Sequence, residues 1–199
     1  MRSDPTVLAF DTSAAHCAAA LLRGGAIVAS VVEAMDKGQA ERLMPLLQSL
    51  LAGAGIGWGD LDGIGVGVGP GNFTGVRISV AAARGIALAA GIPAVGVTTL
   101  EAAALDAPRP VTVALDARRG AVYAQGFDPD SPPALLDVAP AGPLIGDIPG
   151  ATPPAHPIAE AIARIAATRL DTPQPRPAPL YLRPADAAPP RDPAPVILP

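Results

Sequence analysis

Two polar segments, far apart in the chain, contain the side chains that could perform chemistry. Asp11, Thr12 and Ser13 directly follow one apolar run, and Asp116 follows a second apolar run in the same way. A carboxylate and two hydroxyls at the end of a strand could hold a magnesium ion and a phosphate group. If the two runs end at one cleft, Asp11 and Asp116 could together bind a metal or act as acid and base.

A structural interpretation of the same residues is favoured. Asp11 would cap its turn while the neighbouring hydroxyls bond local backbone groups, and Asp116 would close a turn beside Arg118 or Arg119. The sequence contains no Gly-x-x-x-x-Gly-Lys-Ser/Thr loop, which would bind the phosphates of a nucleotide. We therefore predict a vestigial nucleotide cleft at most, and no catalytic residue.

The histidines and the cysteine do not form a metal-binding or nucleophilic pattern. His16 and His156 are far apart in the sequence, so they cannot stand one turn apart on a helix as a zinc-binding pair would. Cys17 points to the opposite face of its strand from His16, and no base accompanies it in a recognisable motif. We expect no metal site and a buried, unreactive thiol.

Residues 63–79 are predicted to form a strand, a glycine-rich turn and the start of a helix. Every second residue from Gly63 to Gly69 is glycine, and the residues between them are Ile or Val. Because side chains alternate between the faces of a strand, one face of this strand has none. Such a face is typical of close approach by a helix or another backbone. Gly69, Pro70 and Gly71 form the turn, and we expect Gly71 to need a positive φ angle.

Apolar periodicity predicts the elements that would position these residues. We expect strands at 7–10, 17–22, 26–32, 62–69, 93–97, 111–115, 121–127, 135–138 and 143–145, and helices at 41–52, 74–90, 100–106 and 158–170. The run that ends at Asp116 repeats the pattern of the run that ends at Asp11, an apolar strand, an Asp, a short turn and a second strand. This repetition indicates an internal duplication of one fold.

Four segments resemble one protein family. GPGNFTGVRIS, from Gly69 to Ser79, strongly resembles the GPGSFTGxRIG signature of the TsaB (YeaZ) family. LAFDTSAAHCAAALL resembles the first hairpin of that family, ALDARRGAVYAQGF the hairpin of its second domain, and PLYLRPADA its C-terminal segment. The resemblance is dense over residues 6–127, resumes at 179–187 and is weak between.

The resemblance implies an α/β fold with two ribonuclease-H-like halves of the ASKHA, or actin-like, superfamily. We expect an N-terminal βββαβαβα domain at 1–107, a truncated second domain at 108–187 and a loose Pro-rich tail at 188–199. In this superfamily the segment that corresponds to Asp11, Thr12 and Ser13 is the first phosphate loop. Gln39 stands near the place where the family usually has a His.

The resemblance also implies a function. It predicts a non-catalytic scaffold and dimerisation subunit of the complex that transfers threonylcarbamoyl to adenosine 37 of tRNAs that read ANN codons. The implied partners are a TsaD-type catalytic subunit and a TsaE-type ATPase, with a homodimer when the chain is alone and tRNA contacted only indirectly. The chain would bind no cofactor by itself, and ATP and magnesium would enter only through partner subunits. The alternative is a small ATPase or kinase of the same superfamily that uses Asp11 and Asp116.

The two longest helices are predicted to form the partner interface. A helix that covers a sheet needs one apolar stripe, but these two helices have apolar or small residues on more than one side. The apolar surface that the sheet leaves uncovered must therefore be covered by something else. Arg77 and Arg84 share one face, where they would contact a phosphate, a partner carboxylate or solvent. The expected interface residues are Leu43, Leu46, Leu47, Leu50, Val76, Arg77, Val80 and Arg84.

Composition limits the classes of function. The 199 residues are 50% hydrophobic, which allows a sizeable core, and the net charge is −4 without a basic run. This charge argues against tight, independent binding of nucleic acid. The single cysteine fits a reducing compartment, and no signal peptide is visible. The apolar helix at 76–90 carries Arg77 and Arg84 and is too short to span a bilayer, so we expect a cytoplasmic protein without membrane contact.

Overall fold

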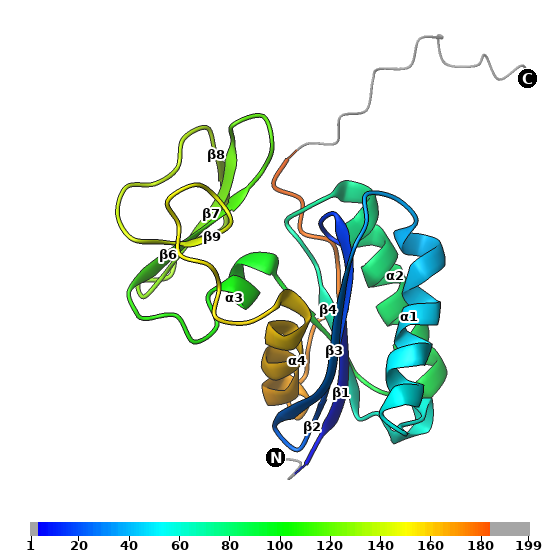
Figure 1. Cartoon of the computed structure of the whole chain (residues 1–199). Coiled ribbons are helices and arrows are strands. Elements are labelled where there is room, and N and C mark those ends of the chain that lie inside the picture. Colours follow the sequence, from blue (N-terminus) through cyan, green and yellow to red (C-terminus); the bar gives the residue numbers. More distant parts are fainter. Residues whose placement is uncertain (1–3, 184–199) are drawn as a thin grey trace, which may run out of the picture.

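The computed structural model describes residues 4–183 (Figure 1). In chain order its elements are β1 (Thr6–Asp11), β2 (His16–Arg23), β3 (Ala26–Ala34), α1 (Gln39–Gly53), the 3-10 turn η1 (Trp58–Asp60), β4 (Gly63–Gly67), α2 (Phe73–Ala90), β5 (Ala94–Val97), α3 (Thr99–Ala103), β6 (Val111–Asp116), β7 (Val122–Phe127), β8 (Ala134–Leu136), β9 (Leu144–Gly146) and α4 (Ile158–Arg169). The strands form two separate sheets.

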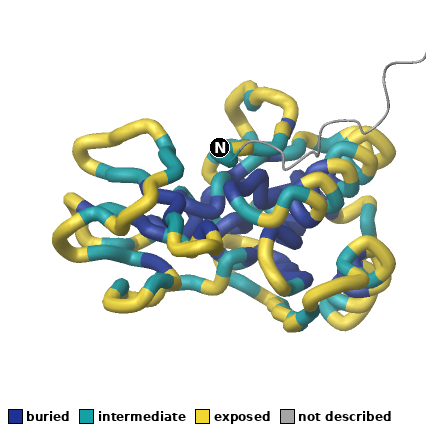
Figure 2. Tube along the Cα trace, turned by 90° about the horizontal axis from the view of Figure 1, so that it is seen from above, coloured by how far each residue is buried: buried dark blue, intermediate teal, exposed yellow. Residues whose placement is uncertain are grey.

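The first sheet has five strands in the order β3-β2-β1-β4-β5. β2 pairs antiparallel with β1 and β3, whereas β4 lies parallel to β1 and β5 parallel to β4. Every residue of β1 and β4 is buried, which is expected for central strands with helices on both faces. The buried residues run through the middle of the molecule (Figure 2).

Helices α1 and α2 cover one face of this sheet, and α4 covers the other (Figure 1). On the first face Leu8, Phe10 and Leu21 of the sheet form one core with leucines of α1 and valines of α2. On the second face Val7, Ala9 and Val95 pack against the alanines and isoleucines of α4. Residues that alternate along β1 therefore contribute to two different cores.

The glycine face of β4 lies directly beneath α4, so the predicted close approach of a helix is confirmed. A Cβ atom added to Gly65 would lie 3.0 Å from both Ile162 and Ala166 of α4. A Cβ atom at Gly63 would overlap the side chain of Leu170. The missing side chains on β4 thus create the space that α4 fills.

Helix α4 corrects the expected division of the chain. The sequence assigned residues 158–170 to the second half, but α4 packs on β1, β2 and β4 of the first sheet. The segment after it also returns to the first half, where the Leu180 N–H donates to the Val68 carbonyl at 2.7 Å. The predicted docking of 180–182 is therefore seen at Leu180. The proposed tail at 188–199 lies outside the described residues.

The second sheet repeats the first in shortened form. Its order is β8-β7-β6-β9, with β6 antiparallel to β7 and parallel to β9. This is the order of the first four strands of the first sheet, so the predicted duplication and truncation are both confirmed. Within residues 4–183, no helix lies between β8 and β9. The short helix α3 packs on this sheet through Leu100 and Ala103, beside Val113 and Tyr123.

The turn between β4 and α2 departs from expectation in one respect. Gly69, with φ +89°, takes the positive φ that we predicted for Gly71. Gly71 is needed for space instead, because a Cβ atom there would lie 2.5 Å from the Ser13 carbonyl oxygen. Asn72 caps α2, and its Oδ1 accepts a hydrogen bond from the Gly75 N–H at 3.0 Å.

Helix α2 is long and apolar enough, by length and composition alone, to cross a membrane. In this fold the apolar composition of α2 is explained by its packing on the first sheet. Val76, Val80 and Ala83 pack into the first core, and Arg77 lies on the exposed side. The helix is thus accounted for as one of the two that cover the sheet.

Candidate functional site

Asp11 ends β1 in a fully buried position. Its Oδ2 accepts hydrogen bonds from the Ser13 N–H at 2.9 Å and from the Ser13 hydroxyl at 2.8 Å. The Nε2 of His16 lies 2.7 Å from the same oxygen. Oδ1 of Asp11 is also buried and has no partner among the described residues. Asp11 therefore organises the turn between β1 and β2, and its side chain is closed to solvent.

His16 was not predicted as a partner of Asp11. The antiparallel register pairs Asp11 with Ala18, so His16 lies two residues away on the same face of the adjacent strand. A sequence argument that fixed the register of this hairpin would have found the contact. Cys17 points to the other face, as expected, and joins the core beneath α1 and α2.

Thr12 connects the first turn of the chain to the beginning of α2. Its hydroxyl donates to the Gly75 carbonyl at 2.7 Å, and its own carbonyl oxygen lies where a Cβ atom of Gly75 would be. The Asn72 N–H donates to the Ser13 carbonyl at 2.6 Å. The two segments that first suggested a phosphate loop are therefore tied directly to each other.

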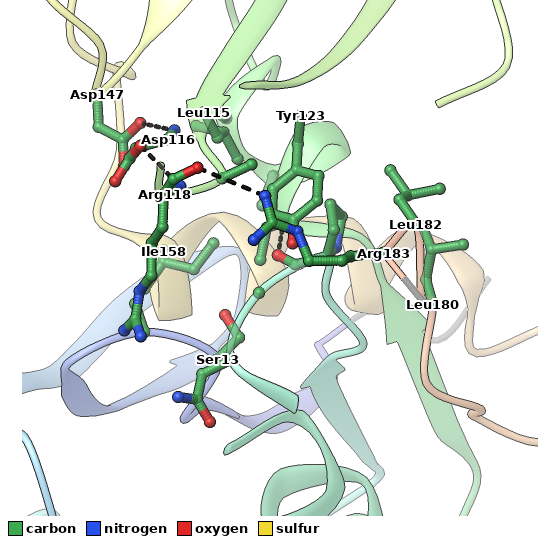
Figure 3. Close-up of a pocket in the computed structure, with 18 of the residues that line it drawn as sticks. Ser13, Leu115, Asp116, Arg118, Tyr123, Asp147, Ile158, Leu180, Leu182 and Arg183 are labelled. Carbon is green, nitrogen blue, oxygen red and sulfur yellow. Dashed lines mark hydrogen bonds between the residues drawn. The ribbon is translucent and has the colours of Figure 1, made fainter. Parts of the chain in front are cut away.

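An open cleft of about 750 Å³ lies between the two halves. Its lining comes from the β1–β2 turn, the start of α2, α3, the β6–β7 turn and the segment 180–183. Figure 3 shows Ser13 on the side of the first half, and Asp116, Arg118 and Asp147 on the side of the second. Asp116 lines the cleft, whereas Asp11 does not, so the two carboxylates do not face each other as a pair.

Asp116 stabilises the turn between β6 and β7. Its Oδ1 accepts a hydrogen bond from the Arg118 N–H at 2.9 Å, and its own N–H donates to Oδ1 of Asp147 at 2.7 Å. These contacts are those of an aspartate that closes a turn. Within residues 4–183, no group of three or more His, Cys, Asp or Glu side chains could hold a metal ion.

Most of the predicted interface residues are in the core, which corrects the prediction. Five of the eight are at most 3% exposed, because they are the residues with which α1 and α2 cover the sheet: Leu43, Leu46, Leu47, Val76 and Val80. Leu50 and Arg84 are half-buried, and Arg77 is exposed. Helical spacing identified residues that share a face but not which face would point inward.

The outward side of the same helices carries a different set of residues. On α2 five exposed residues form one stripe at helical spacing, and the last two residues of the helix are exposed as well. The stripe consists of Thr74, Arg77, Ala81, Gly85 and Leu88. Leu88 is 85% exposed, and Met44 of α1 is 44% exposed. This stripe is small or apolar except for its arginine, and α2 contains no acidic residue.

Arg77 is fixed in place by two aromatic rings. Its guanidinium carbon lies 3.7 Å from the centre of the Phe73 ring, and its Nε donates to the Tyr181 hydroxyl at 2.8 Å. The Phe73 and Tyr181 rings are 4.7 Å apart between centres. Nearby, the Nε of Arg84 donates to the Pro177 carbonyl at 2.7 Å. Both arginines thus hold the C-terminal segment on α2, a role that the sequence did not indicate.

Two further contacts fix the start of α1. Glu33 of β3 accepts two hydrogen bonds of 2.6 Å from Arg42. These bonds lower the pKa of Glu33 below its usual value and raise that of Arg42. Gln39 donates to the Met35 carbonyl at 3.1 Å, so in this chain it stabilises the helix entrance.

Burial raises the pKa of the Cys17 thiol from 9.0 to about 11, and the nearby charge of Glu33 adds to the effect. The folded protein therefore holds this proton more tightly than the unfolded chain, and stability is lost as pH rises from 9 to 11. In urea unfolding at pH 8 and pH 11, we expect wild type to lose about 2 kcal/mol more than Cys17→Ala. Equal losses in the two proteins would contradict this expectation.

Comparison with known proteins gives a consistent result. A family model described as TsaD, tRNA N6-adenosine threonylcarbamoyltransferase, matches residues 27–130, which is just over half of the chain. The tRNA threonylcarbamoyladenosine biosynthesis protein TsaB of Escherichia coli (strain K12) is 37% identical over 122 residues, or 59% of this chain and 52% of the relative. The protein of the same name from Bacillus subtilis (strain 168) is 38% identical over 121 residues, or 59% and 53%. The chain spans about half the length of the curated relatives that it matches.

A solved structure supports the same relationship across more of the chain. YeaZ from Pseudomonas aeruginosa is 29% identical, with a TM-score of 0.70, and the match covers 89% of this chain and 100% of that one. Together with the two related sheets, this likeness confirms the predicted α/β fold of two ribonuclease-H-like halves.

Proposed function

The chain belongs to the TsaB (YeaZ) family, and we propose that it is a scaffold subunit in the biosynthesis of tRNA threonylcarbamoyladenosine, after which several of its curated relatives are named. In this role it binds a TsaD-type catalytic subunit, which transfers threonylcarbamoyl to adenosine 37 of tRNAs that read ANN codons. A TsaE-type ATPase joins the pair, and tRNA is contacted only through the complex. The chain works in the cytoplasm and forms a homodimer when its partner is absent.

The outward face of α1 and α2 is the observation that carries this proposal. Small residues such as Ala81 and Gly85 let another helix approach closely, which increases dispersion contacts. Leu88 and Met44 add apolar area at the edges of the face. The guanidinium of Arg77 is held by Phe73 and Tyr181, so little side-chain entropy is lost when a partner carboxylate binds it.

The burial of the Asp11 side chain favours a scaffold function over that of a kinase or ATPase. A magnesium-binding carboxylate must reach the ligand, but the Asp11 side chain is fully buried beneath Ser13 and His16. Asp116 is engaged in its own turn. We therefore assign ATP and magnesium to the partner subunits and no cofactor to this chain.

Charge placed on the α2 face is expected to abolish capture of a co-expressed TsaD-type subunit. Ala81→Glu inserts a carboxylate at the centre of the stripe, where it would be desolvated against the partner. Leu88→Glu should weaken binding about tenfold or more, as loss of an apolar contact at an interface does. Affinity would be measured by titration calorimetry, and the homodimer by light scattering.

Val138→Glu is the matched control, because Val138 is 77% exposed but lies in the second half. It should bind like wild type. A folded Ala81→Glu variant with full affinity would place the interface elsewhere. A wild-type chain that captures no TsaD-type subunit, or that hydrolyses Mg-ATP alone, would overturn the scaffold proposal.

A further inference from the structure

The cleft between the halves is lined by apolar and polar side chains for which the scaffold role has no use. One end is apolar, where Leu180 and Leu182 lie beside Tyr123, and the other end is polar, where Arg118 lies over Ser13 (Figure 3). A cavity of about 750 Å³ falls within the range of small-molecule sites, which are mostly apolar with a few convergent polar groups.

The lining of the whole cleft holds more arginines than aspartates, although the net charge of the chain is negative. Three arginines line the cleft, Arg118, Arg119 and Arg183, against the two aspartates Asp116 and Asp147. Both aspartates already accept hydrogen bonds from backbone N–H groups of the second half. The cleft therefore has an excess of positive charge, which favours an anion.

Arg118 is the cation available to a ligand. Its backbone makes the contacts of the turn, since its N–H binds Asp116 and its carbonyl accepts from Arg183. The guanidinium has no hydrogen bond or ion pair within residues 4–183, and it extends beside Ile158 toward the first half (Figure 3).

Among residues 4–183, the first half contributes no carboxylate to the lining of the cleft, as a metal-bound phosphate chain would require. Asp11 is fully buried and does not line the cleft, whereas Ser13 and His16 from the same turn do. An anion bound here would contact the guanidinium directly, without a bridging cation.

We propose that this cleft binds a small organic anion without a metal ion. The anionic group, a phosphate or carboxylate, binds Arg118, and an aromatic or aliphatic body packs against Tyr123, Leu180 and Leu182. This site borders the helix face proposed for the partner subunit, because Phe73 and Tyr181, which hold Arg77, also line the cleft.

Phenyl phosphate is a suitable probe, with inorganic phosphate and phenol as its two separate parts. We expect titration calorimetry and NMR shifts to show binding of phenyl phosphate in the range of about 0.1–1 mM. Each part alone should bind at least about tenfold more weakly, and EDTA should change nothing. Arg118→Gln should weaken phenyl phosphate about tenfold or more, because a charge-assisted hydrogen bond is lost.

Arg23→Gln is the matched control, since it removes the same charge from an exposed site at the β2–β3 turn. It should bind phenyl phosphate like wild type. The proposal is overturned if wild type shows no binding at 5 mM, chosen as about five times the weakest expected dissociation constant. It is also overturned if phenol binds equally well, if magnesium is required, or if folded Arg118→Gln retains full affinity. If Arg118→Gln does not fold, the comparison of phenyl phosphate with phenol on the wild-type protein still tests whether binding requires the anionic group.

Discussion

Gly75→Ala is expected to destabilise the protein by about 3 kcal/mol, whereas Gly85→Ala on the same helix should stabilise it by up to about 1 kcal/mol. At Gly75 a Cβ atom would overlap the carbonyl oxygen of Thr12. The overlapped atoms belong to the backbone, so no side-chain rotation can relieve the contact. Gly85 is exposed, and a Cβ atom there meets nothing within 4 Å.

Thermal unfolding of both variants measures the difference. For a domain of this size, each kcal/mol corresponds to a shift of about 2–4 °C in Tm. We expect Gly75→Ala to melt about 6–12 °C below wild type and Gly85→Ala to melt slightly above it. Similar midpoints for the two variants would show that the β1–β2 turn and α2 are not in close contact at Thr12.

The opposite signs of these effects could not be read from the helix sequence. Both glycines lie in the apolar, small-residue stretch 73–90, and helix propensity alone predicts that alanine stabilises either position. What separates them is the contact between Gly75 and Thr12, whose sequence separation is 63. Local pattern identifies the helix, but only the tertiary fold determines which glycine is required for space.

The same limit explains the errors in the candidate site. Leucine spacing in α1 correctly gave an amphipathic helix, but burial of Leu43 and Leu47 depends on where the sheet lies. The exposed stripe around Ala81 shares only Arg77 with the predicted set, and its other residues are displaced around the helix axis. The hairpin of β1 and β2 was predicted, but the contact of Asp11 with His16 needed the exact register.

The position of α4 was the largest difference, although the sequence carried a signal for it. An amphipathic pattern at 158–169 does not say which sheet the helix covers. The buried face of α4 is rich in alanine, and the glycine face of β4 accepts a helix with small side chains. Matching these two faces would have placed α4 on the first sheet despite the intervening second half.

Ile162→Ala should therefore destabilise the first half, not the second. Ile162 is fully buried, and its Cγ2 lies over Gly65. Because β4 has no side chain there to fill the gap, we expect a loss of about 3 kcal/mol, within the usual range for such a cavity. Amide hydrogen exchange should become faster in β1 and β4 and stay unchanged in β7.

Leu136→Ala in β8 provides the control, because Leu136 is 36% exposed on the second sheet. Its cost should be below about 1 kcal/mol, since little buried area is removed, and exchange in β4 should not change. If Ile162→Ala instead accelerates exchange in β6 and β7 while β4 stays protected, α4 belongs energetically to the second half. The expected result would mean that the first sheet gains the helix that covers its second face only after the chain has passed through the second half and returned.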